Sequence, residues 1–224
     1  MADNRLFVQQ NTVGRASDGS VVGQRGTRDG SAFVLPWYMG FALEGRVFTA
    51  NAGSLATPVS AANAAVTNLR PMAVLRVPSG TTIIPIKTTI SPRALAGTVN
   101  DIIVAFCQND VGNGTSSAMT VGPINSKTDA TVASTVTARQ LYTGDCTAPT
   151  NPVELLHRCD PYAQSADANG ASLNTAINFP ESPQDTLPIL VGPASWLVYV
   201  GATTTGPTFY ASFEWVEAPS SYFT

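Results

Sequence analysis

The hydrophobic pattern of the C-terminal part predicts two strands joined by a turn. Ser195–Gly201 (SWLVYVG) is almost wholly apolar, as expected for a strand that is covered on both faces. In Thr208–Glu217 (TFYASFEWVE) the residues alternate, which places one set on a single face: Phe209, Ala211, Phe213 and Trp215. A threonine-rich turn over Ala202–Pro207 lies between the two segments, so we predict a β-hairpin, with Leu187–Val191 leading into it.

Apolar runs bounded by Gly, Pro and Asn predict further strands upstream. They are Ser31–Leu43, Arg46–Ala50, Pro71–Val77, Thr81–Ile90, Asp101–Gln108, Met119–Ile124 and Ala130–Tyr142. Pro85 places its strand at an edge or a bulge, and Pro92 is expected to end that strand. Asp101–Gln108 is nearly all apolar, so both of its faces should be covered.

The other segments predict loops and one half-exposed strand. In Ala130–Tyr142, one face should carry Val132, Val136 and Tyr142. Residues 51–68 and 143–185 are predicted as loops, with Val153–His157 as a candidate helical turn inside the second. No strand is followed by a convincing long helix, which argues against a parallel βαβ fold.

Composition supports the same class of fold. Val, Ile and Thr make up 56 of the 224 residues, and there are 18 glycines and 16 prolines, as in a sheet protein with many turns. We predict an all-β protein, an antiparallel β-sandwich over residues 32–224, preceded by a flexible or extended glycine-rich arm at 1–31. The chain contains no run of about 18 apolar residues, so no membrane span is expected.

Charge is scarce and unevenly distributed. Only 12% of the residues are charged, against about 25% in ordinary soluble proteins, which suggests that other copies cover much of the surface. Residues 1–93 carry a net charge of +5, whereas residues 145–224 carry −7. These two parts can pair within one folded chain, or they can meet across an interface between subunits.

Candidate chemistry is sparse, and most enzyme classes lack their motifs. The single histidine, His157, lies near Cys146, Cys159 and Asp160, which leaves three alternatives: a zinc site, a Cys146–Cys159 disulfide, or free side chains. Cys107 is expected to be a buried apolar side chain. Nucleophile-elbow, phosphate-loop and zinc-protease motifs are absent from the sequence.

Two acidic residues near the C-terminus could imitate a catalytic pair. Glu214 and Glu217 are three positions apart, which places them on opposite faces of a strand, and we interpret them as ordinary edge charges. We therefore predict that the chain is not an enzyme and that it has no catalytic, cofactor-binding or metal-binding residue.

The arm and the aromatic residues are the remaining candidate sites. Arg5, Arg15, Arg25 and Arg28 could contact phosphates or a neighbouring subunit, but the arm's net charge is only +1, so we expect weak or no direct nucleic-acid binding. Six aromatic residues could line a sugar-binding face or belong to the core: Trp37, Tyr38, Trp196, Tyr199, Phe213 and Trp215.

The layout of a glycine-rich arm, a strand-rich domain and a final SWLVYVG–turn–TFYASFEWVE segment resembles the single jelly-roll capsid proteins of icosahedral viruses and phages. The resemblance implies a jelly roll that assembles into a shell through pentamers or trimers, with other virion proteins as further partners. It also implies a location in the virion, an arm that lies inside the shell or links subunits, and an outer or intersubunit role for the 143–185 loop. The alternative is a lectin-like or receptor-binding jelly roll, such as a fibre head or a carbohydrate-binding domain.

Overall fold

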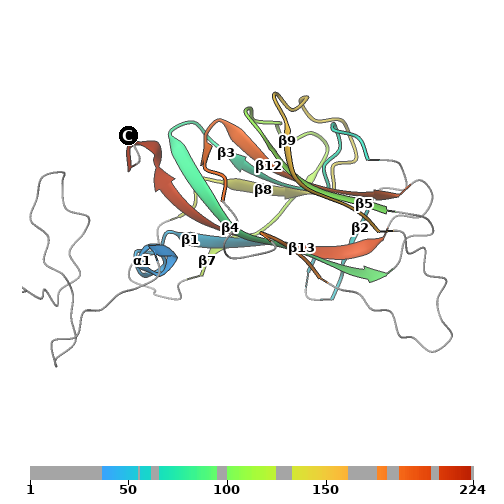
Figure 1. Cartoon of the computed structure of the whole chain (residues 1–224), viewed down its shortest axis with the longest axis horizontal. Helices are drawn as coiled ribbons and strands as arrows, with labels where there is room; N and C mark the ends of the chain where they lie inside the picture. The colour runs from blue at the N-terminus through green and yellow to red at the C-terminus, as the bar shows by residue number, and fades with distance from the viewer. Residues whose placement is uncertain are drawn as a thin grey trace, which may run out of the picture. The chain divides into compact units, whose positions relative to one another are not determined.

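The computed structural model describes residues 37–54, 56–61, 66–94, 100–124, 133–160, 176–180, 187–202 and 207–222. The chain divides into two compact units, Met1–Gly40 and Phe41–Thr224. The second unit is a sandwich of two antiparallel sheets, which Figure 1 shows one above the other. A short 3-10 helix, η1 (Ser220–Tyr222), follows the last strand. No helix in the described ranges has the length and apolar character needed to cross a membrane.

One sheet has seven strands. Its order is β10 (Ile177–Phe179), β4 (Thr81–Ala94), β13 (Thr208–Pro219), β1 (Val47–Ala52) and β7 (Val121–Pro123), with β11 (Leu190–Val191) also on β4 and β2 (Val59–Ser60) on β13. The other sheet has six, in the order β6 (Ser117–Ala118), β8 (Thr137–Gln140), β3 (Ala73–Val77), β12 (Ala194–Ala202), β5 (Asn100–Cys107) and β9 (Val153–Asp160). The prediction of an all-β antiparallel sandwich is confirmed.

The strands pair in a nested order. β1 pairs with β13, β3 with β12, β4 with β10 and β11, and β5 with β9. Strands early in the chain therefore pair with strands late in the chain in the opposite order, as in one long hairpin folded over on itself. In each sheet one further pairing joins two of these nested pairs. It is β4 with β13 in the seven-stranded sheet and β5 with β12 in the six-stranded sheet.

The predicted C-terminal hairpin is wrong. β12 and β13 begin and end close to the predicted strands, but β12 lies in the six-stranded sheet and β13 in the seven-stranded one. Both sides of β12 are taken by β3 and β5, and both sides of β13 by β1 and β4. Because both sides of each strand are already paired, β12 and β13 do not pair with each other, and the chain passes from one sheet to the other between them.

Side chains from the facing sides of both sheets form the main core. Trp196 of β12 and Trp215 of β13 are both 0% exposed. Trp215 stacks on Phe48 with ring centroids 6.0 Å apart, and Trp196 contacts Phe179 at 5.4 Å. Phe213 and Tyr199 are also buried, so these four aromatic candidates form core rather than a sugar-binding face.

A second, smaller cluster covers the outer face of the six-stranded sheet. It contains Val74, Ile103, Ala105, Cys107, Val111, Tyr142, Cys146, Leu197 and Tyr199. Hydrogen bonds tie the loops over it to the sheet: Tyr199 Oη donates to Asn68 O at 3.0 Å, and Tyr142 Oη to Gly112 O at 2.8 Å. All nine residues of β12 are consequently buried, as the unbroken apolar pattern predicts.

Both prolines of β4 lie at irregularities in its pairing with β13. The register shifts at Glu214/Trp215, opposite Pro85, and again at Thr208/Phe209, opposite Pro92. The bulge predicted for Pro85 is confirmed. The predicted end at Pro92 is wrong, because the second irregularity accommodates the proline and the strand continues to Ala94.

Three other predicted elements differ from the structure. Trp37–Leu43 forms helix α1 instead of a strand, and the chain turns after it at Gly45 (φ 73°), whose N–H bonds to Ala42 O at 3.0 Å. The candidate helical turn at Val153–His157 is part of strand β9, which pairs with β5. Residues 130–132, with Val132, lie outside the described residues, and in the described part of Ala130–Tyr142 only β8 is a strand. Leu141 (φ 56°) breaks the alternation, so that Val136 and Tyr142 lie in different clusters.

Candidate functional site

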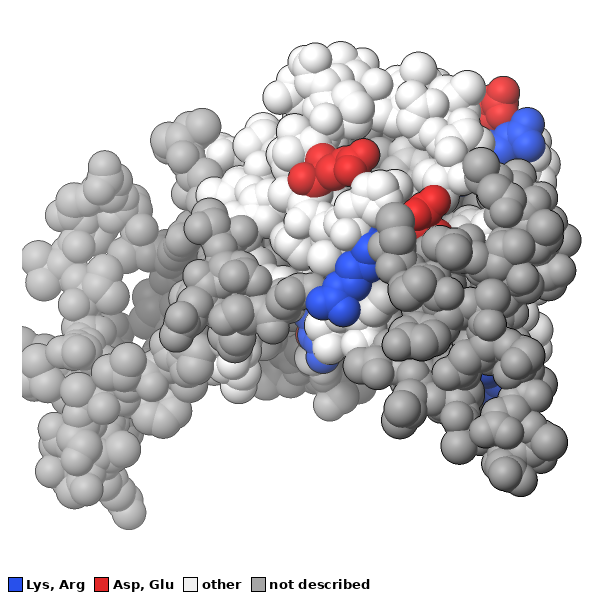
Figure 2. Space-filling model, turned by 45° about the vertical axis from the view of Figure 1, so that its right-hand side comes forward, with Lys and Arg blue, Asp and Glu red and all other residues white. Residues whose placement is uncertain are grey.

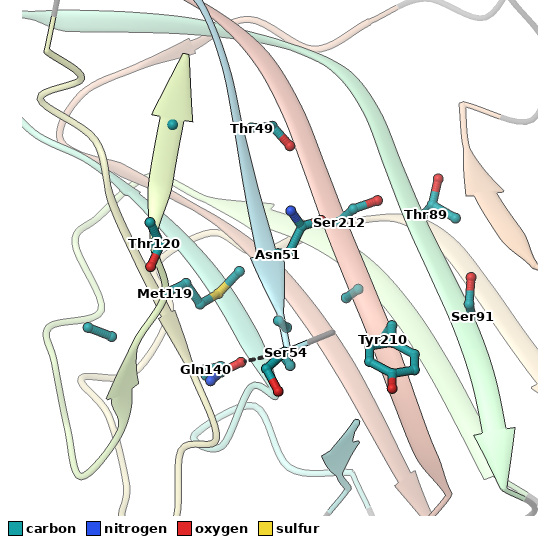
Figure 3. A pocket seen from close by; sticks show the side chains of 15 residues that line it. Thr49, Asn51, Ser54, Thr89, Ser91, Met119, Thr120, Gln140, Tyr210 and Ser212 are labelled. Carbon is teal, nitrogen blue, oxygen red and sulfur yellow. Dashed lines mark hydrogen bonds between the residues drawn. The ribbon is translucent and has the colours of Figure 1, made fainter. Parts of the chain in front are cut away.

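A groove of about 740 Å³ runs over the outer face of the seven-stranded sheet. The outward-facing residues of β1, β13 and β4 form its floor, since along these strands they alternate with residues that face the core. The segment around β6 and β7 forms its side (Figure 3). The lining residues are Thr49, Asn51, Ala52, Gly53, Ser54, Thr89, Ser91, Ala118, Met119, Thr120, Gly122, Gln140, Tyr210, Ala211 and Ser212.

All of the polar groups in this lining are neutral. Hydroxyl groups from Thr and Ser predominate, with two carboxamides, Asn51 and Gln140, and one phenol, Tyr210. Within the described residues, six of these side chains make no hydrogen bond: Thr49, Asn51, Ser54, Ser91, Thr120 and Ser212. They are therefore available to a ligand that both donates and accepts hydrogen bonds.

Tyr210 is held in place at both ends of its ring. Gly53 (φ +89°) lies against it, and a Cβ there would be only 3.0 Å from Tyr210 Cδ1 and 3.0 Å from Thr57 O. At the other end, Arg93 Nη1 donates a hydrogen bond to Tyr210 Oη at 3.2 Å. The ring is thus a fixed platform on the groove floor, and glycine is required at position 53 both by φ and by space.

Gln140 links the two sheets at one end of the groove. It belongs to β8 of the six-stranded sheet, yet its Oε1 accepts a hydrogen bond from Gly53 N–H at 2.7 Å. This contact, dashed in Figure 3, joins the turn after β1 to β8. The end of the groove is therefore preformed.

A charged cluster lies elsewhere, beside the outer cluster of the six-stranded sheet. Arg76 Nε and Nη2 donate to the two carboxylate oxygens of Asp110, both at 2.5 Å, and Arg76 Nη1 also donates to Asn113 Oδ1. The paired guanidinium lowers the pKa of Asp110, and the carboxylate raises the pKa of Arg76. These groups satisfy each other, so the cluster fixes the 108–116 loop and offers no unpaired charge for catalysis.

Of the four residues considered for zinc or a disulfide, the structure describes the side chains of Cys146 and His157 but not those of Cys159 and Asp160. Cys146 is a free thiol buried in the outer cluster with Cys107. His157 lies instead beside two acids of the six-stranded sheet, with Nδ1 3.3 Å from Glu154 Oε2 and Nε2 3.6 Å from Asp101 Oδ1. The side chain of Cys159 lies outside the described residues. In the described part of the chain, no group of three His, Cys, Asp or Glu residues could hold a metal ion.

Burial dominates the chemistry of both described thiols. It raises the pKa of Cys146 to about 11 and also raises the pKa of Cys107. Neither thiol is a nucleophile near neutral pH. The expectation that Cys107 is a buried apolar side chain is confirmed, since it is 0% exposed.

The interpretation of Glu217 as an edge charge is wrong. Only 7% of it is exposed, and its carboxylate accepts three close hydrogen bonds: Ser134 Oγ at 2.5 Å, Thr135 N at 2.7 Å and Thr135 Oγ1 at 2.7 Å. Glu214, three residues earlier, is half-buried. The carboxylate of Glu217 thus joins the end of β13 to the segment that leads into β8.

Four candidate residues from the sequence belong to the part of the chain that the structure does not describe. Arg5, Arg15, Arg25 and Arg28 lie outside the described residues. Sequence reasoning missed Tyr210, although the alternation of TFYASFEWVE already places Tyr210 with Ser212 on the face opposite the core. The other groove residues come from four separate parts of the chain, 49–54, 89–91, 118–122 and 140, and only the sheet order brings them together.

Comparisons of the chain with protein-family models, with curated proteins and with solved structures found no match.

Proposed function

We propose that the sandwich is a jelly roll and that the chain is a structural subunit which assembles with copies of itself into the icosahedral shell of a virus or phage. The observation that carries the proposal is the nested pairing of β1 with β13, β3 with β12, β4 with β10 and β11, and β5 with β9. Within the two sheets these strands form two runs of four, β1-β13-β4-β10 and β3-β12-β5-β9. Such a pair of four-stranded runs supports a jelly roll, a fold common in viral shells.

The low surface charge supports assembly. Figure 2 shows a face on which the described surface is mostly uncharged, with a few acidic and basic side chains, some of them side by side. Isolated soluble domains usually carry more charge as a protection against association. A subunit whose surface is covered by its neighbours does not need this protection.

An exposed aliphatic pair supplies a specific contact for a neighbouring copy. Ile189 and Val191 are 59% and 57% exposed, while Leu190 between them is buried. They lie at β11, which pairs only with β4 among the described strands. Apolar side chains beside an open strand edge favour pairing with another chain. We propose this edge, the β11 edge, as one subunit contact.

We propose that the basic and acidic parts of the sequence pair both within one chain and between copies. Arg70 pairs with Asp145 at 2.7 Å, which joins the basic and acidic parts within one chain. Between copies, the arm, with Arg5, Arg15, Arg25 and Arg28, is proposed to contact neighbouring subunits or other virion proteins, and its charges would orient them. A location in the virion follows from the same proposal.

The test compares the wild type with a variant charged at the β11 edge. Ile189→Asp with Val191→Asp should leave the far-ultraviolet circular dichroism unchanged and convert assembled protein into smaller species in sedimentation velocity. Ser60→Asp with Ser79→Asp adds the same charge at two exposed polar positions and should assemble as the wild type does. Equal assembly of both double variants would show that the β11 edge is not a subunit contact.

A further inference from the structure

We propose that the groove on the seven-stranded sheet binds a neutral saccharide. This inference does not depend on assembly, because all of the groove residues belong to one chain. It uses a different site from the aromatic side chains considered in the sequence, of which Trp196, Trp215, Phe213 and Tyr199 are buried.

The charge of the lining excludes the common ionic ligands. Among the described residues, no lysine, arginine, histidine, aspartate or glutamate lines the groove. Arg93 reaches its border, but there its guanidinium donates to Tyr210 Oη. A phosphate, a nucleic-acid backbone or a polyamine would lose its hydration without gaining a charged partner, so an uncharged ligand fits best.

The polar groups match a ligand that carries many hydroxyls. Thr49, Asn51, Ser91 and Ser212 come from three neighbouring strands, and none of these side chains is hydrogen-bonded to a described residue. Figure 3 shows Asn51 and Ser212 next to each other on adjoining strands, with Tyr210 further along the same floor. Hydroxyl and carboxamide groups both donate and accept, as sugar hydroxyls require.

Tyr210 supplies the apolar half of such a site. A pyranose ring has an apolar face of C–H groups, and an immobile aromatic ring provides a flat surface for it. Gly53 and Arg93 hold the Tyr210 ring in place, so little side-chain entropy is lost on binding. The volume of about 740 Å³ falls within the usual range for small-ligand sites.

An extended peptide fits the groove less well. Each of the three floor strands is already paired on both sides: β1 with β13 and β7, β13 with β1 and β4, and β4 with β13 and β10. A peptide lying across them would gain no main-chain hydrogen bonds from the sheet, which are the main source of affinity in strand addition. The lining also offers few large apolar side chains, since Met119 is only 7% exposed.

Binding is tested on the full chain with neutral oligosaccharides. Saturation-transfer difference NMR and calorimetry would use maltotriose, cellobiose, lactose and N,N′-diacetylchitobiose, with sialyllactose as the anionic comparison. We expect at least one neutral oligosaccharide to bind with a dissociation constant of about 0.1–1 mM, a value typical of few-contact sites. Sialyllactose should not bind more tightly than lactose. If no neutral oligosaccharide binds, or only the anionic one does, the proposal is wrong.

Three groove variants and one control locate the site. Tyr210→Ala should weaken binding at least 10-fold, whereas Tyr210→Phe keeps the ring and should weaken it about two- to threefold. Asn51→Ala changes an exposed side chain, so it tests the groove even if Tyr210→Ala folds poorly. Lys87→Ala lies on β4 outside the groove lining and should bind as the wild type does. Unchanged binding in both Tyr210→Ala and Asn51→Ala would overturn the assignment.

A peptide is the competing occupant. A synthetic peptide of residues 1–31 is titrated into the full chain and into Tyr210→Ala. If this peptide binds through Tyr210 and the saccharides do not, the groove accepts a segment of a second copy and the saccharide proposal is wrong. Light scattering on the same samples reports assembly separately, so failure of saccharide binding and failure of shell formation remain distinguishable.

Discussion

Glu217 accepts two hydrogen bonds from one residue, Thr135, whose N–H and hydroxyl each donate to Oε1 at 2.7 Å. Ser134 Oγ donates to the other carboxylate oxygen at 2.5 Å. A carboxylate that is 7% exposed is stable there only because its oxygens are well supplied with donors. The end of β13 is joined in this way to the segment that leads into β8, a strand of the other sheet.

Glu217→Gln should destabilise the protein. The amide keeps one acceptor oxygen but turns an NH₂ group toward donors, so at least one close hydrogen bond is lost. We expect the free energy of unfolding to fall by about 2 kcal/mol, the usual range for a buried bond to a charged group. Urea denaturation measures this value. Glu214→Gln, on the same strand and half-buried, is the control and should change it by less than about 0.5 kcal/mol.

Gly192→Ala should be among the most damaging single changes. A Cβ at Gly192 would lie 1.9 Å from Pro78 O and 2.8 Å from Val77 O, so backbone must move. We expect a loss of about 3 kcal/mol in stability, near the upper end for overpacking. Gly122→Ala is the matched control, because a Cβ there meets nothing within 4 Å. Equal melting temperatures for the two variants would contradict the close approach of these backbones.

The Asp110–Arg76 pair predicts a pH-dependent contribution to stability. The pKa of Asp110 is lower in the folded chain than its ordinary value, so the unfolded chain binds more protons between these two values. The pair therefore stabilises the fold above the ordinary carboxyl range of about pH 4, and this contribution is lost as the pH falls through the lowered pKa.

Thermal unfolding of Asp110→Asn from pH 7 to pH 2.5 tests this. The variant should unfold at a lower temperature than the wild type at pH 7, by an amount that corresponds to about 1 kcal/mol for a partly exposed pair. The difference should shrink below about pH 4. Asp145→Asn breaks the more exposed contact with Arg70 and should have a smaller effect. A difference that stays constant down to pH 2.5 would show that the carboxylate charge of Asp110 is not the cause.

The two described thiols should be unreactive in the native protein. With the pKa of Cys146 raised to about 11, about one thiol in a thousand is ionised at pH 8, and burial also limits access. Iodoacetamide labelling followed by peptide mass spectrometry should find Cys107 and Cys146 unmodified in buffer and fully modified in guanidinium chloride. Rapid labelling of Cys146 in buffer would mean that the loop over the outer cluster opens easily.

The strands of this fold could be predicted from the sequence where both faces are buried. Asp101–Gln108 and Ser195–Gly201 are continuous apolar runs, and the structure places them as β5 and β12, between the main core and the outer cluster. Local alternation also predicted β13. Such signals are local, and burial on each face is sufficient to produce them.

The partners of the strands could not be predicted in the same way. Adjacency in sequence favoured pairing of the last two strands, but β12 and β13 belong to different sheets. The pairing of β1 with β13 joins residues more than 150 positions apart, and nothing in either segment encodes the other. Glu217 shows the same limit, because its donors Ser134 and Thr135 come from a distant segment.

The groove depends both on the local alternation of residues and on the packing of distant strands. The outward position of Tyr210 follows from alternation along its strand, whereas Gln140 reaches Gly53 only because the two sheets are stacked. A site made from neutral hydroxyls has no sequence motif, since Ser, Thr and Asn are common on any exposed strand. The fold had to be known before these residues could be recognised as neighbours.

The most direct test of the proposed shell function is the mass of the purified wild-type protein in solution. Size-exclusion chromatography with light scattering, repeated from low to high salt and followed by negative-stain electron microscopy, measures that mass and the shape of the particles. We predict rings, pentamers, trimers or closed shells of this 23.4 kDa chain. A single species of about 23 kDa at high protein concentration under every salt condition would contradict the proposal that this protein builds a shell.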